Sequence, residues 1–167
     1  LIFIGPKAEV IKKMGDKNIA RYLMKKNGIP IVPGTEKLND ETMDAIKEHA
    51  RRIGYPVILK ASGGGGGRGI TLVRNDDELR GFYMNHDALQ GGDLNEYFVE
   101  RFIDKGRHVE TQCGRDTHGN FTVYSTRDCS VQRRNQKLVE EAPAPFLPDT
   151  VMEQLARYSR NLFEAVG

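Results

Sequence analysis

Apolar residues follow two periods along the chain, and each period predicts one kind of element. Apolar positions three and four apart, such as Ile19, Ala20 and Leu23, predict a helix over residues 17–27. Similar patterns predict helices over residues 8–14, 41–53, 77–89 and 150–166. We expect single glycines to end three of these helices, at Gly15, Gly28 and Gly54. The expected caps are Asp16, Asn39 or Asp40, Asn75 or Asp76, and Asp149.

Short apolar runs and strict alternation predict the strands. Apolar runs predict strands at residues 57–59, 70–73 and 97–99, a buried strand at residues 1–4, and a short extended piece at 31–32. Alternation over residues 108–113 and 121–126 predicts an antiparallel pair joined by a turn at 116–120. Residues 31–103 therefore read strand, helix, hairpin, helix, strand, which indicates a compact α+β unit.

An uninterrupted glycine run, residues 63–67, lies between the predicted strands at 57–59 and 70–73, with Lys60 and Arg68 on either side. A Walker-type loop joins a strand to a helix and ends in Lys-Ser or Lys-Thr, so this loop is of another kind. Glycine lets successive backbone N–H groups turn toward one anion. We therefore predict a phosphate-binding flap; the plain alternative is a hairpin tip or linker.

Composition and charge exclude several classes of protein. The 167 residues are 38% hydrophobic and 29% charged, which is typical of a globular chain. A net charge of +2 gives no argument for a nucleic-acid or membrane partner, and no apolar run reaches the roughly 20 residues of a membrane helix. The two cysteines, Cys113 and Cys129, have no metal or redox spacing and indicate free thiols in a reducing compartment.

A polar cluster between residues 127 and 141 leaves two interpretations open. Arg127, Arg133, Arg134 and Lys137 lie close in sequence to two glutamates. Cationic side chains often line a solvated edge strand, but they also form anion sites. His108 is equally ambiguous, because a lone histidine is more often structural, although its strand neighbours the unit with the glycine loop.

Five segments in order resemble biotin carboxylase, the ATP-grasp component of acetyl-CoA, propionyl-CoA, pyruvate and urea carboxylases. The resemblance spans almost the whole chain and rests on FIGPK, MGDK, IGYPVILKASGGGGGRG, RHVETQ and RDCSVQRRNQKLVEEAPAP. It implies an α/β (α+β) ATP-grasp fold. Residues 1–30 would be the end of an N-terminal Rossmann-like domain and linker, 31–103 the small lid domain, and 104–167 the first part of the central domain.

The resemblance also implies an activity. The parent protein would be an ATP-dependent carbon–nitrogen ligase that carboxylates biotin on a carrier protein, using bicarbonate and passing through carboxyphosphate. ATP and Mg²⁺ (or Mn²⁺) would be its cofactors. Its partners would be a biotin carboxyl carrier protein or domain and a carboxyltransferase, in a homodimer or larger complex, without nucleic acid or membrane. The expected compartment is the cytoplasm, or the mitochondrial matrix for a eukaryotic protein, and fatty acid biosynthesis by acetyl-CoA carboxylase is one expected setting.

Site residues carry over by motif position. At the bicarbonate and biotin end the resemblance implies Gln132, Asn135 and Lys137. Asn135 departs from the histidine usual in the family, and asparagine cannot carry that charge. The expected ATP-binding residues are Lys17, Lys60, Gly63, Gly64, Gly65, Gly66, Gly67, Glu100, Arg101, Ile103 and His108. Lys17 and Lys60 would contact phosphates, Glu100 would accept from the adenine amino group, Arg101 would contribute backbone, and His108 would lie near the ribose.

We expect these residues to contain only part of a biotin carboxylase site, and two other functions remain as alternatives. The family's metal-binding glutamates would lie beyond Gly167, so we expect no metal ligands in this stretch and no carboxylase activity from these residues alone. The alternatives are another ATP-grasp ligase, such as a carbamoyl-phosphate synthetase, or a non-catalytic nucleotide-binding module. The RDCSVQRRNQK segment argues against the synthetase, and Asn135 is the residue that favours the module.

Overall fold

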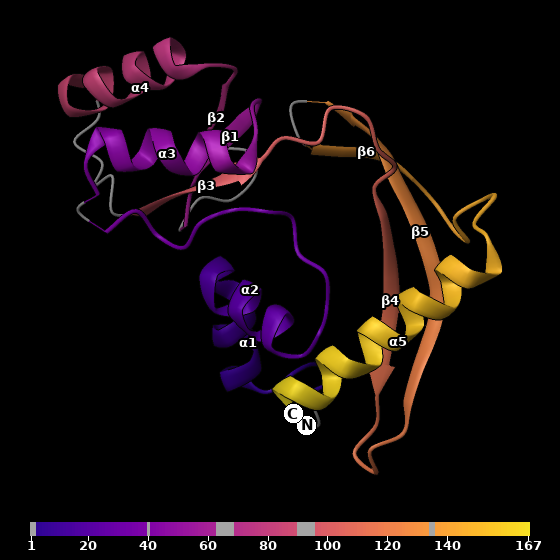
Figure 1. The fold of residues 1–167 in the computed structure, drawn as a ribbon. Helices are drawn as coiled ribbons and strands as arrows, with labels where there is room; N and C mark the ends of the chain where they lie inside the picture. Colours follow the sequence, from indigo (N-terminus) through magenta and orange to yellow (C-terminus); the bar gives the residue numbers. More distant parts are fainter. Residues whose placement is uncertain (1–2, 40, 63–68, 90–95, 134–135) are drawn as a thin grey trace. The chain divides into compact units, whose positions relative to one another are not determined.

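The computed structural model describes residues 3–39, 41–62, 69–89, 96–133 and 136–167, which form two compact units (Figure 1). The first unit comprises Leu1–Gly15, Ile19–Ile31 and Lys105–Gly167, and the second comprises Asp16–Asn18 and Val32–Asp104. Each unit contains a three-stranded sheet. The boundaries at 31 and 103 that we predict for the lid domain remain predictions.

The sheet of the second unit has the order β2-β1-β3 and is antiparallel throughout. Its strands are β1 (Val57–Ala61), β2 (Ile70–Val73) and β3 (Tyr97–Arg101). β1 and β2 pair antiparallel, so the predicted strand-to-strand setting of the glycine run is confirmed, although residues 63–68 lie outside the described ranges. Gly69 directly precedes β2, the strand that runs back along β1. Its carbonyl accepts from Ala61 N at 2.9 Å, and its φ is +69°.

The core of this unit lies between its sheet and two helices, α3 (Met43–Ile53) and α4 (Asp76–Leu89). Successive side chains on a strand face opposite sides, so Val57 and Leu59 point into the core from β1. Ile46 and Ala50, four positions apart on α3, complete the contact. Burying one such leucine or isoleucine stabilises the fold by about 1.5–3 kcal/mol.

Helix ends in the second unit correct one prediction and confirm two. Thr42, not Asn39 or Asp40, caps α3, because its backbone is extended and its hydroxyl accepts from Ala45 N at 3.3 Å. Gly54 ends α3 with φ +92°, as predicted. Asn75 Oδ1 accepts from Glu78 N at 2.9 Å and caps α4, which is one of the two caps that we predict there.

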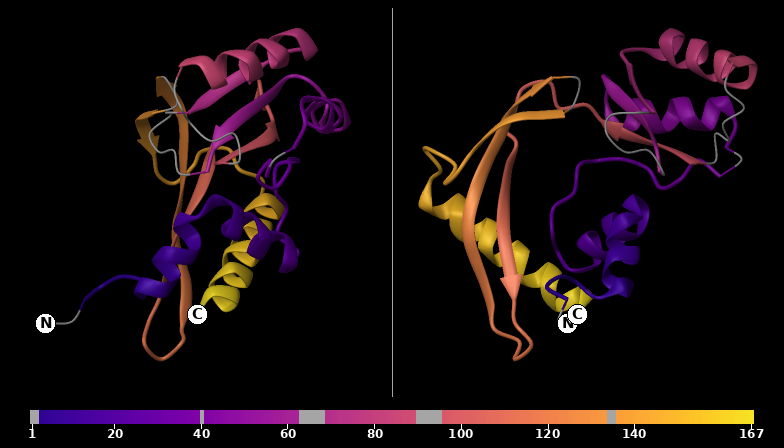
Figure 2. Two further views of the ribbon diagram at one scale, coloured as in Figure 1. Left: turned by 90° about the vertical axis from the view of Figure 1, so that its left-hand side faces the viewer. Right: turned by 180° about the vertical axis from the view of Figure 1, so that it is seen from behind.

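The first unit has an antiparallel sheet of order β4-β5-β6. Its strands are β4 (Val109–Arg115), β5 (Phe121–Arg133) and β6 (Gln136–Glu141). Helix α5 (Asp149–Val166) lies against β4 and β5 (Figures 1 and 2). The contact includes Thr111 Oγ1 and Ser159 Oγ, 2.8 Å apart, and an edge-to-face pair of Phe121 and Phe163.

The chain also contains α1 (Ala8–Gly15) and α2 (Lys17–Lys26), both predicted. Asp16 Oδ1 accepts from Asn18 N at 2.8 Å at the start of α2, which confirms the predicted cap.

Three predictions for the remaining elements are wrong. Phe3 and Ile4 form no strand and are 76% and 96% exposed, because no neighbouring strand among the described residues pairs with them. Residues 31–32, read from the sequence as the first strand of the unit, belong to no strand, and an isolated bridge joins Gly34 to Glu100. Asp149 is the first residue of α5 rather than its cap, since Pro148 precedes the helix with extended backbone.

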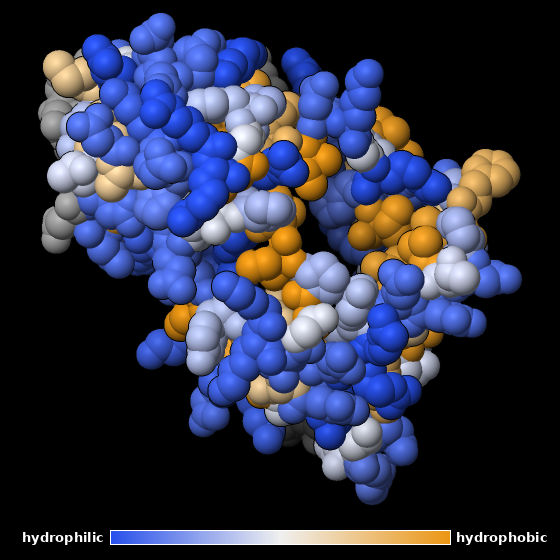
Figure 3. Space-filling view, viewed as in Figure 1, coloured by the Kyte–Doolittle hydropathy of each residue, from blue (hydrophilic) through white to orange (hydrophobic). Residues whose placement is uncertain are grey.

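No helix in the described ranges is both long and apolar enough to cross a bilayer. The face in Figure 3 is mostly hydrophilic, with smaller apolar groups between the polar side chains.

Candidate functional site

A network of four charged side chains crosses the sheet of the first unit. Glu110 on β4 and Arg127 on β5 are register partners, and Arg127 Nη2 donates to Glu110 Oε1. Lys137 on β6 donates to the other oxygen of the same carboxylate. Arg127 Nη1 donates to Glu140, and Lys137 Nζ lies 3.8 Å from Glu140 Oε1. Two cations therefore share two carboxylates.

The pKa values in this network move in the directions that its ion pairs require. The hydrogen bond from Lys137, followed by that from Arg127, lowers the pKa of Glu110. The same contact with Glu110 raises the pKa of Lys137. Hydrogen bonding to Glu110 also raises the pKa of Arg127. The Glu110 carboxylate is thus held charged and Lys137 is held as an ammonium.

His108 and Gln132 lie beside this network. Gln132 Nε2 lies 2.8 Å from His108 Nδ1 and donates to the Cys129 carbonyl at 2.9 Å. His108 N donates to Ser130 Oγ at 2.9 Å, and its carbonyl accepts from Cys129 N at 2.7 Å, so the backbone of His108 is fixed on both sides. With the amide nitrogen as donor, His108 Nδ1 is the acceptor in this contact.

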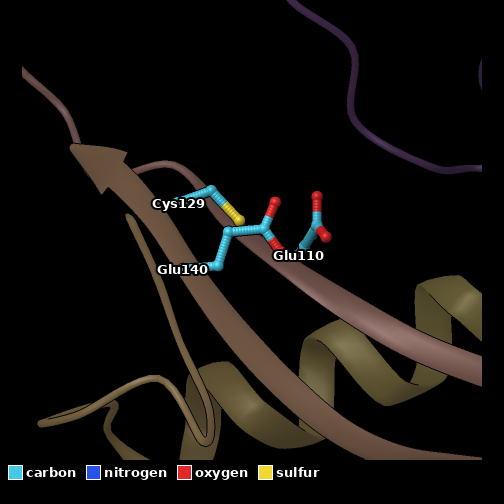
Figure 4. A group of neighbouring side chains, drawn as sticks. All are labelled: Glu110, Cys129 and Glu140. Carbon is cyan, nitrogen blue, oxygen red and sulfur yellow. The ribbon is translucent and has the colours of Figure 1, made fainter. Parts of the chain in front are cut away.

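Glu110, Cys129 and Glu140 are the group among the described residues that could hold a metal ion (Figure 4). They come from β4, β5 and β6, and one ligand atom from each lies within 4.8 Å of the others. A thiolate with two carboxylates would suit zinc better than magnesium. Both carboxylates, however, already bind Arg127 and Lys137. We interpret the group as part of the ion-pair network rather than as a metal centre.

In the second unit, two of the predicted ATP-binding side chains contact each other. Lys60 on β1 forms an ion pair with Glu100 on β3. Glu100 is only 8% exposed, so its charge needs a partner inside the protein. Lys17 Nζ donates to the Ala61 carbonyl at 3.2 Å, at the end of β1. Lys17, Lys60 and Glu100 thus all belong to the second unit, around β1.

The structure places the predicted site residues in two groups. The second unit holds Lys17, Lys60, Glu100, Arg101 and Ile103, with Arg101 at the exposed end of β3 and Ile103 59% exposed. The first unit brings together His108, Gln132 and Lys137, and Gln132 and Lys137 are register partners on β5 and β6. Asn135 and the five glycines at 63–67 lie outside the described residues.

Glu110 was not singled out from the sequence, although one signal could have found it. It stands two positions after His108, so the alternation of a strand places both side chains on one face. The structure confirms this placement, with His108 Nε2 4.0 Å from Glu110 Oε2.

The chain is similar to several characterised proteins. The family described as "Carbamoyl-phosphate synthase L chain, ATP binding domain" matches residues 16–167. Biotin carboxylase of Haemophilus influenzae is 45% identical over 167 residues, which cover 99% of this chain and 37% of that protein. The alpha subunit of the mitochondrial methylcrotonoyl-CoA carboxylase of Rattus norvegicus is 40% identical, over all of this chain and 24% of that protein.

Solved structures give the same result. The biotin carboxylase domain dimer of the Hydrogenobacter thermophilus 2-oxoglutarate carboxylase, in complex with MgADP, ADP and bicarbonate, matches with a TM-score of 0.86 and 41% identity. The match covers 99% of this chain and 37% of that one. Biotin carboxylase of Campylobacter jejuni, in complex with β,γ-ATP, matches with a TM-score of 0.86 and 39% identity over the same shares. The chain therefore spans between about a quarter and little more than a third of the length of these relatives.

Proposed function

The chain belongs to the family of carbamoyl-phosphate synthase L chain ATP-binding domains, and we propose that it forms part of a biotin carboxylase. The ATP-grasp fold and the resemblance predicted from the sequence are confirmed by the biotin carboxylase structures and sequences that it matches. One observation in the site supports the proposal most. Strand pairing brings together His108, Gln132 and Lys137, three residues that the resemblance assigns to neighbouring parts of one site.

The proposed reaction has two stages. ATP transfers its γ-phosphoryl group to a bicarbonate oxygen, which gives ADP and carboxyphosphate. Carboxyphosphate then splits into CO₂ and inorganic phosphate, the phosphate takes up the proton of biotin N1, and N1 forms a bond to the CO₂ carbon. Positioning and charge neutralisation do most of the work in such a transfer.

We assign the residues of the second unit to the nucleotide. Lys60 and Lys17 would contact the phosphates, since both place an ammonium near the end of β1 that leads into the glycine run. Glu100 would accept from the adenine amino group, while Arg101 and Ile103 would line the base through backbone. The glycines at 63–67 would close over the phosphates.

We assign the residues of the first unit to the other substrates. His108 would lie near the ribose, while Lys137 and Gln132 would face bicarbonate and biotin. Lys137 is well suited to an anion, because its partner Glu110 keeps it protonated. Asn135, in the same assignment, could only donate or accept a hydrogen bond.

Magnesium, which neutralises phosphate charge when bound, fits poorly to the described residues. Mg²⁺ prefers oxygen ligands, whereas the Glu110–Cys129–Glu140 group includes a thiol and its carboxylates are already paired. We therefore propose that its ligands come from the rest of the parent protein.

Partners and compartment follow the same proposal. A biotin carrier and a carboxyltransferase would complete the enzyme. A dimer is supported by the Hydrogenobacter relative, and a cytoplasmic or mitochondrial location by the bacterial and mitochondrial relatives.

The test uses the full protein that contains this chain. We expect ADP formation that requires bicarbonate and is stimulated by free biotin, with carboxybiotin as product. Carbamoyl phosphate from ammonia, bicarbonate and ATP would instead identify a carbamoyl-phosphate synthetase, which the name of the matched family keeps as the second candidate. Nucleotide binding without turnover would identify a non-catalytic module.

A further inference from the structure

We propose that Arg127 is a positioning residue that orients Lys137 toward its anionic substrate by holding the Glu110 carboxylate between them. This inference rests on the proposed function, in which Lys137 faces bicarbonate. Arg127 itself need not touch any substrate.

Arg127 lies on the central strand of its sheet, where it can reach both neighbours. Its register partner on β4 is Glu110, and its two terminal nitrogens donate to Glu110 and to Glu140 on β6. A planar guanidinium is suited to this fork, whereas an ammonium is a point charge. Arg127 Nε is buried without a hydrogen-bond partner among the described residues, so these two carboxylates orient the group.

Glu110 passes this orientation on to Lys137. Arg127 binds Glu110 Oε1 and Lys137 binds Oε2, so the carboxylate cannot rotate without breaking one of the two contacts. An ammonium has three donors. One is taken by Glu110, and Glu140 lies 3.8 Å away, which leaves donor capacity for an anion.

Charge balance leads to the same conclusion. With Arg127 present, two carboxylates face two cations. Without it, the cluster has a net negative charge next to the ammonium that would receive bicarbonate, and the carboxylate loses one of its two restraints. Both changes disfavour the binding of an anion at Lys137, while the second unit, which holds Lys60 and Glu100, is unaltered.

The first test compares Arg127→Met with Arg127→Lys in the full protein, and measures KM for bicarbonate and for ATP separately. We expect Arg127→Met to raise the bicarbonate KM by about tenfold, the scale of one charge-assisted hydrogen bond, with the ATP KM within about twofold. Arg127→Lys should recover part of the loss, because it restores the charge but not the fork. Arg115→Met, the same change elsewhere in this sheet, should leave both constants unaltered.

The second test does not depend on turnover. Carboxylate NMR titration should show that the pKa of Glu110 rises in Arg127→Met, where Lys137, His108, Cys129 and Glu140 remain as its titratable neighbours. If the parent protein shows no bicarbonate-dependent turnover, the proposed function fails while this titration still tests the contact. An unchanged bicarbonate KM in a folded Arg127→Met, a parallel rise of both KM values, or an unchanged Glu110 titration would each overturn the inference.

Discussion

Lys60 on β1 and Glu100 on β3 form a diagonal ion pair across neighbouring antiparallel strands. Ile58 stands opposite Glu100 and Phe98 opposite Lys60, so the two charged side chains share one face of the sheet. Glu100 is buried and Lys60 is partly exposed. The buried carboxylate thus fixes the Lys60 ammonium on this face of the sheet.

Replacing Lys60 should weaken the use of ATP. In the full protein, Lys60→Ala removes the proposed phosphate contact, so we expect the KM for ATP to rise by at least about tenfold or turnover to be lost. Steady-state kinetics with varied ATP measure this. Lys25→Ala, at an exposed position of α2, is the matched control. An unaltered rate in Lys60→Ala would favour the non-catalytic module.

The effects of replacing Lys60 and Glu100 on the free energy of unfolding should depend on each other. Lys60→Ala removes the ammonium that contacts the buried Glu100 carboxylate, and we expect the free energy of unfolding to fall by about 1–3 kcal/mol. Adding Glu100→Gln removes the buried charge, so the double variant should lose less than the sum of the single losses. Urea denaturation of the four proteins gives the coupling energy, and strict additivity would show that the two side chains do not depend on each other.

The core of the second unit should be sensitive to cavities. Leu59 is 1% exposed among the buried side chains of α3 and the sheet. We expect Leu59→Ala to lower the free energy of unfolding by about 2–5 kcal/mol. Leu138→Ala removes the same atoms from a side chain that is 62% exposed, and its effect should stay within about 0.5 kcal/mol. Denaturant unfolding compares the two, and equal losses would contradict the assigned core.

The cap of α3 provides a smaller test. Thr42→Ala removes the hydroxyl that accepts from Ala45 N, and we expect a loss of about 1 kcal/mol in the free energy of unfolding. Thr42→Ser keeps the hydroxyl and should restore most of this loss. Asn39→Ala, at the position that the sequence favoured, should have little effect on thermal unfolding.

Asp128 should contribute to acid sensitivity. Hydrogen bonds from the Ser130 side chain and backbone, followed by Arg107, lower the pKa of Asp128 from 3.8 to about 2. Because the folded value is the lower one, the charged carboxylate stabilises the fold above about pH 3.8, and this contribution disappears as the pH falls through about 2. Carboxylate NMR should report this pKa, and Ser130→Ala should raise it. Asp128→Asn should remove the corresponding part of the acid dependence of unfolding.

Sequence patterns predicted the elements with a clear apolar period. Val57, Ile58 and Leu59 form a continuous apolar run, and the strand formed where we expected it. The pattern was weakest where polar side chains dominate, so residues 127–141 were left open between a solvated edge strand and an anion site. Ladder pairing with β6, whose side chains are all exposed, extends β5 to Arg133. Backbone hydrogen bonds rather than burial stabilise that hairpin, and hydrophobic patterns do not report them.

The sequence identified several residues of the candidate site, but it did not predict which of their side chains contact one another. His108, Gln132 and Lys137 followed from motif positions, and the sheet register brought them together. The partners Glu110 and Arg127 depend on cross-strand pairing between residues 17 positions apart, which no local pattern specifies. The Lys60–Glu100 pair was hidden for the same reason, since 40 positions separate its members.

Gly69, the residue directly before β2, limits which substitutions the fold can tolerate at this position. A Cβ atom there would lie 2.9 Å from the Ala61 methyl carbon, and the positive φ of Gly69 adds strain for any other L-residue. Saturation mutagenesis under selection for a folded protein should therefore recover almost only glycine at position 69. The next position, Ile70, is partly open to solvent and should accept many side chains. The number of side chains that the fold tolerates would thus change sharply between the neighbouring positions 69 and 70.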